Sequence, residues 1–271
     1  MAKRRVVVTG MGAITPLGNS VGEFWANALA GKSGVGPITH FDVTQYDSKI
    51  AGEVKNFDPS SMIDRKDARH YDLFVQYAIM AAKEALAQAG LDMEKEDRTR
   101  AGAVVGSGIG GIAPLQEQYE ILLNKGPNRC SPFLIPMMIP NMAAGAMAIK
   151  FGLEGHNNCT VTACASGNSA LADAMRTIQY GDADIMLAGG AESVVCRTAV
   201  AGFSAAKALS LRNEDPQRAS RPFDRDRDGF VIGEGAGIAV LESLEHAQAR
   251  GAKILVELCG IGQSNDAFHM T

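Results

Sequence analysis

Strand-like and helix-like segments alternate along this chain, and that alternation most constrains the fold that it can adopt. Residues 5–9 and 101–105 are short apolar runs typical of buried strands, and each leads into glycines. Between them, residues 72–85 repeat apolar side chains at helical spacing, behind Asp72, a residue type that often begins a helix. Strands separated by helices are typical of an α/β fold, so we predict that class with a substantially parallel, buried sheet.

Further segments continue the alternation. Ser20 precedes an apolar helical pattern that ends at Gly31, and residues 141–150 are rich in Ala and Met, as helices often are. Residues 231–242 predict a strand that follows a charged loop.

One internal similarity predicts a second structural unit. Residues 2–12 and 252–262 share Ala, Lys, Val and two glycines at matching positions. A true repeat would make residues 1–251 one half of a larger fold and residues 252–271 the start of the other half. We therefore expect this chain to be the first part of a longer protein.

Composition excludes several classes of function. The 271 residues are 46% hydrophobic and carry a net charge of −4, which is ordinary for a globular protein and unlike a general nucleic-acid binder. No apolar stretch reaches the roughly 20 residues that span a bilayer, so we expect no membrane partner. Five cysteines without a compact spacing pattern suit a reducing compartment, and we expect a cytoplasmic protein.

Cys164 lies at the corner of a strand–helix–strand unit, where a β-type run meets a helix of small residues that stops near Gly181. Backbone N–H groups at a helix N-terminus favour negative charge, so they stabilise a thiolate and can hold an oxyanion. Ala163, Ala165 and Gly167 leave room for a substrate. The alternative is a buried packing cysteine, the role that we expect of the other four cysteines. We predict that Cys164 is a nucleophile.

A glycine-rich segment at residues 106–111 has the spacing G-x-G-x-x-G directly after a strand. A dinucleotide site would also need an acidic residue at the end of a second strand about 20 residues later. Residues 126–132 form a loop pattern there instead. We therefore interpret the segment as a glycine turn that gives access to a pocket.

Two charged segments carry weaker signals. Residues 224–229 begin like a calcium loop, but Gly235 stands where the twelfth-position Glu belongs, so we predict a loop of paired charges. No set of histidines and cysteines has zinc spacing, and we expect no metal site. Residues 65–70 form a basic cluster that is either a solvated face or a dock for an acidic partner.

The segment Thr-Ala-Cys-Ala-Ser-Gly at residues 162–167 resembles the active-site segment of β-ketoacyl-acyl carrier protein synthases. These are the elongating condensing enzymes of fatty acid synthesis, and the likeness is to those of type II. Further matching segments are spread over the chain at residues 4–12, 106–111, 180–184, 189–192, 221–224 and 227–231. The resemblance implies a thiolase-like layered α/β/α/β/α fold, of which this chain is the first half plus the start of the second. It also implies a homodimer.

The resemblance assigns roles to individual residues. Cys164 corresponds to the nucleophile that accepts the acyl chain as a thioester, and its own N–H would form part of the oxyanion hole. The residues expected to line the acyl pocket are Gly108, Ile109 and Phe203, with Leu134 and Ile135 entering the pocket of the partner subunit. The residues expected to present positive charge to acidic acyl carrier protein are Lys66, Arg69, Arg129 and Lys207. The residues expected at the edge of the phosphopantetheine tunnel are His269 and Thr271.

The family also uses two histidines, a lysine and a glycine-rich Phe segment that would all lie beyond Thr271. We therefore expect little or no condensation of acyl and malonyl thioesters by this chain alone. No cofactor is expected, because phosphopantetheine arrives on the acyl carrier protein. Two alternatives stay open at this point: a thiolase or other thiol acyltransferase, and a non-enzymatic dimerisation paralogue.

Overall fold

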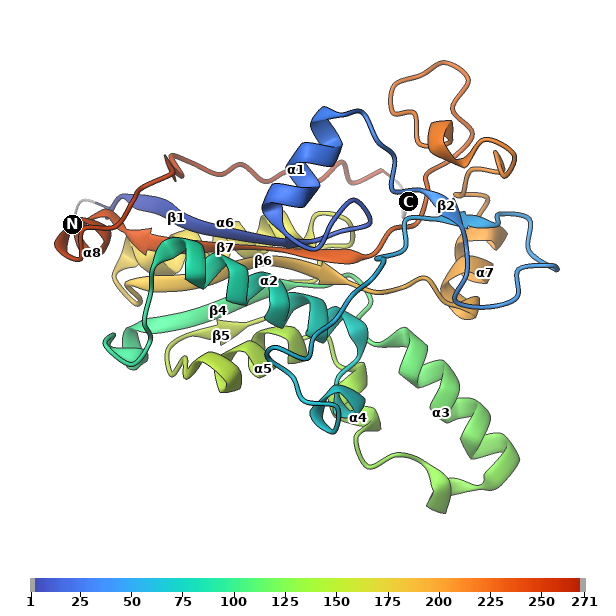
Figure 1. Ribbon diagram of the computed structural model, residues 1–271, viewed down its shortest axis with the longest axis horizontal. Coiled ribbons are helices and arrows are strands. Elements are labelled where there is room, and N and C mark those ends of the chain that lie inside the picture. Colours follow the sequence, from blue (N-terminus) through green and yellow to red (C-terminus); the bar gives the residue numbers. More distant parts are fainter. Residues whose placement is uncertain (1–2, 269–271) are drawn as a thin grey trace.

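A computed structural model describes residues 3–268, which are built around a six-stranded sheet of order β5-β4-β6-β7-β1-β8 (Figure 1). The strands are β1 (Val6–Ile14), β4 (Ala101–Gly106), β5 (Asn157–Asn158), β6 (Ile185–Glu192), β7 (Gly235–Ser243) and β8 (Val256–Glu257). The predicted α/β class is confirmed. The expectation of a substantially parallel sheet is wrong, since among the six strands described in this sheet only β4 pairs in parallel, with β5 and with β6.

The mixed pairing follows from the connections between strands. Helices cross over between β4, β5 and β6, and a crossover brings the chain back in the same direction. Residues 193–234 instead stay at one end of the sheet, around α7 (Arg197–Ala205), so β7 returns antiparallel to β6 (Figure 1). β1 pairs antiparallel with β7 in turn.

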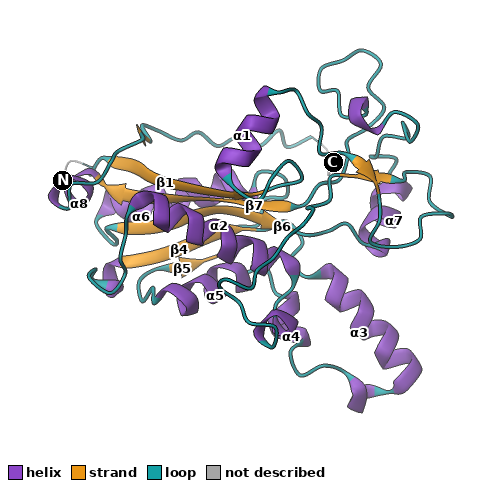
Figure 2. Cartoon of the chain, viewed as in Figure 1, coloured by secondary structure: helices purple, strands orange, loops and turns teal. Residues whose placement is uncertain are grey.

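Helices cover both faces of the sheet (Figure 2). α2 (Leu73–Ala89) and α5 (Met142–Phe151) pack on one face, and α6 (Ser166–Tyr180) packs on the other. The predicted apolar positions of the long helix are fully buried, and they are Phe74, Ala78, Ala81, Ala82 and Ala85. α2 ends at Gly90 and α6 ends at Gly181, each glycine in the left-handed conformation that stops a helix.

The sequence pattern indicated that the glycines at the start of the chain end the first strand, but the strand continues through them. β1 runs through Gly10 and Gly12 to Ile14, directly beneath α2. A Cβ at Gly10 would lie 2.0 Å from the Ala85 carbonyl oxygen, and one at Gly12 would lie 1.8 Å from that of Ala81. These glycines therefore allow close approach of helix to strand, which is a different use of the same residue.

α1 (Val21–Leu29) begins where predicted, and the Ser20 side chain accepts a hydrogen bond from the Glu23 N–H. None of its residues is buried, and Trp25 is 59% exposed. Between α1 and α6 the sheet surface is open as an apolar groove of about 630 Å³, lined in part by Met11, Phe24, Trp25 and Leu171.

The remaining elements lie outside the sheet layers. α3 (Ile112–Lys125) and α4 (Leu134–Met138) project together from one end of the sheet (Figure 1). β2 (Gly36–Pro37) and β3 (Ile50–Ala51) form a separate pair, and α8 (Leu244–Ala249) follows β7. No helix in residues 3–268 has the length and apolarity to cross a membrane.

Residues 252–268 run along the outer edge of the sheet. Within the segment matched to the chain start, only Val256–Glu257 pairs, antiparallel to β1. Cys259 is exposed, so its expected packing role is wrong, whereas Cys196 is buried as expected. The division into a first half and the start of a second stays a prediction.

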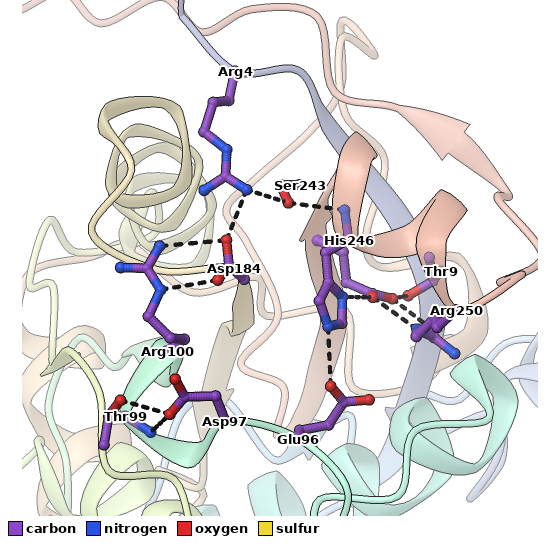
Figure 3. Close-up of polar contacts among 11 residues, drawn as sticks. Arg4, Thr9, Glu96, Asp97, Thr99, Arg100, Asp184, Ser243, His246 and Arg250 are labelled. Carbon is purple, nitrogen blue, oxygen red and sulfur yellow. Dashed lines mark hydrogen bonds and ion pairs between the residues drawn. The ribbon is translucent and has the colours of Figure 1, made fainter.

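Buried charges near α8 are fully paired (Figure 3). The Glu242 carboxylate is completely buried. It accepts hydrogen bonds from Thr9, from His246 and from the Nε and Nη2 atoms of Arg250. Burial opposes ionisation of Glu242, but these hydrogen bonds outweigh it and the pKa is about 2. Close by, Asp184 pairs with Arg4 at 2.7 Å and with Arg100 at 2.9 Å.

Candidate active site

Cys164 lies in an exposed turn between β5 and α6. The predicted corner between strand and helix is present, although β5 ends at Asn158 and the segment that follows is irregular. Ala163 has a φ of +49°, a left-handed conformation that is uncommon for a residue with a side chain. Such conformations cost about 1–3 kcal/mol and cluster at functional sites.

Ser166 braces the turn that carries the thiol. Its hydroxyl donates to the Ala163 carbonyl oxygen at 2.6 Å and accepts from the Thr162 N–H at 3.0 Å. The Thr160 hydroxyl in turn donates to the carbonyl oxygen of Ser166 at 2.8 Å. The left-handed residue before Cys164 is therefore held by the first residue of α6.

The N-terminus of α6 abuts the ends of β4 and β6. A Cβ at Gly106 would lie 2.2 Å from the Ser166 carbonyl oxygen, so only glycine fits there. Within residues 3–268, the N–H groups of Gly167 and Asn168 in the first turn of α6 make no hydrogen bond. Free N–H groups at a helix start favour negative charge nearby, as the sequence predicts for the site of Cys164.

The glycine-rich segment after β4 is held by a carboxylate from β6. Glu192 Oε1 accepts from the Ser107 hydroxyl at 2.9 Å and from the Gly110 N–H at 3.3 Å. Glu192 Oε2 accepts from the N–H groups of Gly108 at 2.6 Å and Ile109 at 3.2 Å. The donors that would cradle a phosphate are already paired inside the protein, which supports the interpretation of this segment as a pocket turn.

The structure brings part of the predicted acyl pocket to the thiol. A Cβ at Gly108 would lie 3.5 Å from the Ala163 carbonyl oxygen, and the neighbouring Ile109 is 38% exposed. Phe203 belongs to α7, where it packs edge-on against Phe230 at 5.3 Å between ring centroids.

Leu134 and Ile135 begin the helix whose last residue contacts the glycine turn, where the Gly111 N–H donates to the Met138 carbonyl oxygen at 3.0 Å. Both belong to α4, in the part of the chain that projects from the sheet, and Ile135 is 57% exposed (Figure 1). Their predicted role in the pocket of a partner subunit stays a prediction.

The predicted carrier-facing residues are exposed but lie on three separate segments. Lys66 and Arg69 belong to the short helical turn at residues 66–70, Arg129 ends a second turn, and Lys207 follows α7. His70 stacks on Phe133 with ring centroids 3.7 Å apart, which joins the first of these segments to the start of α4. His269 and Thr271 lie outside the described residues.

Asp72 is a buried acid at the start of α2, at the same end of the sheet. Its Oδ2 atom has no hydrogen-bond partner within residues 3–268. Burial raises the pKa of Asp72 to about 7, and nearby Glu117 and Glu234 add to the effect. Burial also raises the pKa of Glu234, which accepts hydrogen bonds from Val54, Tyr77 and Ser193.

The charged loop before β7 contains paired charges, as predicted. Asp224 pairs with Arg221 at 2.9 Å, and Asp228 lies 3.5 Å from Arg212. Among the described residues, no group of three or more His, Cys, Asp or Glu side chains could hold a metal ion.

Two residues of the site were not assigned roles from the sequence. Glu192 stood in a motif without a function, and Ser166 was not singled out. Ala163 was named as a small neighbour of the thiol, but its left-handed conformation was not predicted. An acidic residue at the end of an otherwise apolar strand is the one signal that could have drawn attention to Glu192.

Known proteins resemble the chain over nearly its whole length. The family model for the β-ketoacyl synthase N-terminal domain matches residues 3–247. The 3-oxoacyl-[acyl-carrier-protein] synthase 2 of Synechocystis sp. is 51% identical over all of this chain and 65% of its own length. That of Vibrio cholerae is 52% identical over all of this chain and 66% of its own. The chain thus spans slightly less than two thirds of these relatives.

Solved structures agree with this relationship. The ishigamide ketosynthase/chain length factor has a TM-score of 0.90 at 38% identity, covering 99% of this chain and 65% of that one. A type II polyketide ketosynthase in complex with its acyl carrier protein has a TM-score of 0.87 at 37% identity, with coverage of 99% and 65%. Fold, glycine turn and braced cysteine together with these matches show that the chain belongs to the β-ketoacyl synthase family, whose N-terminal domain it contains.

Proposed function

We propose that this chain is the N-terminal part of an elongating 3-oxoacyl-[acyl-carrier-protein] synthase, an acyltransferase of fatty acid biosynthesis. The observation that carries the proposal is the exposed Cys164 thiol, on a left-handed turn braced by Ser166 at the start of α6. The two relatives that bear this activity in their names support it across the full chain.

The first step is acyl transfer to Cys164. Its sulfur attacks the carbonyl carbon of an acyl thioester, and the bond from that carbon to the donor sulfur breaks. The donor thiol leaves with the proton, and the acyl group stays on Cys164 as a new thioester. Backbone N–H groups at the turn, including that of Cys164, stabilise the oxyanion as it develops.

The second step is decarboxylative condensation. The malonyl group loses carbon dioxide, and its carbanion attacks the acyl carbonyl carbon, which releases the Cys164 thiolate and forms a β-ketoacyl product. This carbanion needs electrostatic stabilisation. Among the described residues, no histidine side chain hydrogen-bonds to residues 160–166. His246 is bound to carboxylates, His40 lies beside Glu53 and Glu234, and His70 stacks on Phe133. We therefore expect the 271-residue chain alone to be acylated without condensing.

Acyl carrier protein is the proposed macromolecular partner, and the protein is proposed to act as a cytoplasmic homodimer. The basic side chains Lys66, Arg69, Arg129 and Lys207 are exposed, so they are free to meet acidic groups. The solved complex of a relative with its acyl carrier protein supports this choice of partner.

Intact-mass spectrometry tests the acyl transfer. Incubation with a myristoyl-carrier protein should add one myristoyl group to the chain, and Cys164→Ala should abolish the addition. Cys259→Ala is the matched control, because it removes another exposed thiol and should leave acylation unchanged.

The choice of donor separates the alternatives. Faster acylation from acyl-coenzyme A than from the carrier protein would favour a thiolase or another thiol acyltransferase. No acylation from either donor would favour a non-enzymatic paralogue. In the full-length protein, malonyl-dependent chain extension that survives Cys164→Ala would refute the mechanism.

A further inference from the structure

Glu192 reaches from the end of β6 into the glycine-rich segment 107–110, and four donors of that segment converge on its carboxylate. Each carboxylate oxygen accepts two of these hydrogen bonds, so the side chain of residue 192 must offer an acceptor at both oxygen positions. The Gly110 N–H also donates to the Ser107 hydroxyl at 3.0 Å, which closes the segment on itself. Hydrogen bonds to an ionised group are stronger and shorter than neutral ones, so Glu192 is the main polar restraint on this segment.

This segment forms one wall beside the Cys164 turn. The Ser107 N–H donates to the Thr160 carbonyl oxygen at 3.3 Å, and Gly108 lies against Ala163. Ile109 stands next to Gly108 and is partly exposed. Its backbone position relative to the thiol is therefore set from one side by the turn and from the other by Glu192.

We propose that Glu192 is a positioning residue that fixes Ile109 beside Cys164 and thereby sets the length of acyl chain that the thiol accepts. This inference rests on the proposed function, because it concerns the selectivity of the acyl transfer. A segment fixed by four hydrogen bonds limits the acyl chain to a defined length, whereas a loosely held segment would select less strictly between short and long chains.

The chemistry of the four contacts defines a sharp variant. Glu192→Gln keeps the shape of the side chain but replaces one acceptor oxygen with an NH₂ group. At the Oε2 position that group would face the N–H groups of Gly108 and Ile109. At the Oε1 position it would face the Gly110 N–H and the Ser107 hydroxyl, which can turn to accept. In either orientation at least one backbone hydrogen bond is lost and an NH₂ group faces an N–H donor. The outward-facing Glu117 of α3 offers a matched control, since Glu117→Gln makes the same chemical change on an exposed residue.

The test compares acylation rates of the full-length protein with butyryl- and myristoyl-carrier protein. Glu192→Gln should change the ratio of the two kcat/KM values by about tenfold, and Glu117→Gln should leave it unchanged. A ratio that stays within about twofold of the wild-type value would overturn the inference. Absence of acylation in the wild-type protein would instead refute the proposed function, so the two failures are distinct.

A double-mutant cycle separates positioning from general loosening. If Glu192 acts through Ile109, then Glu192→Gln should add little to the selectivity change that Ile109→Ala causes alone. Fully additive effects would overturn the inference. Should Glu192→Gln fail to fold, Ser107→Ala removes one contact of the same carboxylate and should shift the ratio in the same direction by a smaller factor. No shift in that variant would likewise count against the inference.

Discussion

Two buried acids at opposite ends of the central sheet, Glu242 and Asp72, differ in how their charge is compensated. At the end beside α8, Glu242 and Asp184 each meet several cationic or hydroxyl donors (Figure 3). At the end beside Cys164, Asp72 is buried with one oxygen unpaired in the described part of the chain. The paired carboxylate of Glu242 has a pKa of about 2, and the pKa of Asp72 is about 7.

The paired acid stabilises the fold, whereas the unpaired acid lies at the end of the sheet where the chemistry is proposed. Paired charges hold β7, α8 and the connection from α2 to β4 together, far from the thiol. An acid with a raised pKa and the left-handed Ala163 lie at the end where the chemistry is proposed, and such features are common at functional sites. The following experiments can break this comparison, from the largest expected effect to the smallest.

Glu242→Ala should destabilise the chain most. It leaves Arg250 and His246 without their buried partner, which costs about 3–5 kcal/mol in the free energy of unfolding. Urea unfolding measures the change. Glu245→Ala, on the exposed face of α8, should change it by less than about 1 kcal/mol. Similar losses in both variants would contradict the claim that the network at this end carries stability.

Asp72→Asn should stabilise the chain at high pH. The folded pKa of Asp72 is raised to about 7, so its contribution to stability is full below its ordinary pKa and is lost as pH rises through about 7. Asn stays neutral and avoids this loss, so the variant should gain about 2 kcal/mol at pH 8 and little at pH 4. If the free energy of unfolding of the wild type and of Asp72→Asn changed with pH in the same way, the ionised Asp72 carboxylate would have to be paired.

His246→Gln should cost about 1 kcal/mol at pH 6 and progressively less at higher pH. The hydrogen bond to Glu242 raises the pKa of His246 against the effect of burial, and Glu96 pairs with the other ring nitrogen. Arg250 binds the same Glu242 carboxylate. Stability from the protonated ring is complete below its ordinary pKa and is lost as pH rises through the folded value. His156→Gln, at an exposed position, is the control and should change the free energy of unfolding at pH 6 by less than about 0.5 kcal/mol.

Cys164→Ala should have the smallest effect on folding, within about 0.5 kcal/mol, because its side chain is exposed. The same change should abolish acylation. A large loss of stability in urea unfolding would mean that the thiol has a packing role and would weaken the contrast between the two ends.

The sequence predicted those parts of the fold that depend on local pattern. The apolar spacing in α2 and the helix-stopping Gly181 of α6 are local, and both were predicted correctly. The direction of β7 depends on the path of residues 193–234, which no local pattern reveals. Gly10 and Gly12 were misread because a glycine at a turn and a glycine under a helix look alike in sequence.

In the candidate site, too, the sequence revealed what depends on neighbouring residues and not what depends on distant ones. Cys164 could be found because its strand, small neighbours and helix are adjacent in sequence. The contacts that Glu192 makes could not be predicted, because the N–H group of Gly108 that it binds lies 84 residues earlier. The left-handed Ala163 carries no compositional signal, since alanine is usually a helix former.

The contact between β1 and α2 also fixes how the two elements align lengthwise. Gly10 and Gly12 are two residues apart on a strand, about 6.7 Å, and their neighbours Ala85 and Ala81 are four residues apart on a helix, about 6 Å. The two spacings nearly coincide, so α2 contacts β1 at both glycines at once. A shift of the helix by one residue would break both contacts. The alignment of α2 on β1 is therefore set by this contact itself and does not depend on the length of the connection from residue 15 to residue 72.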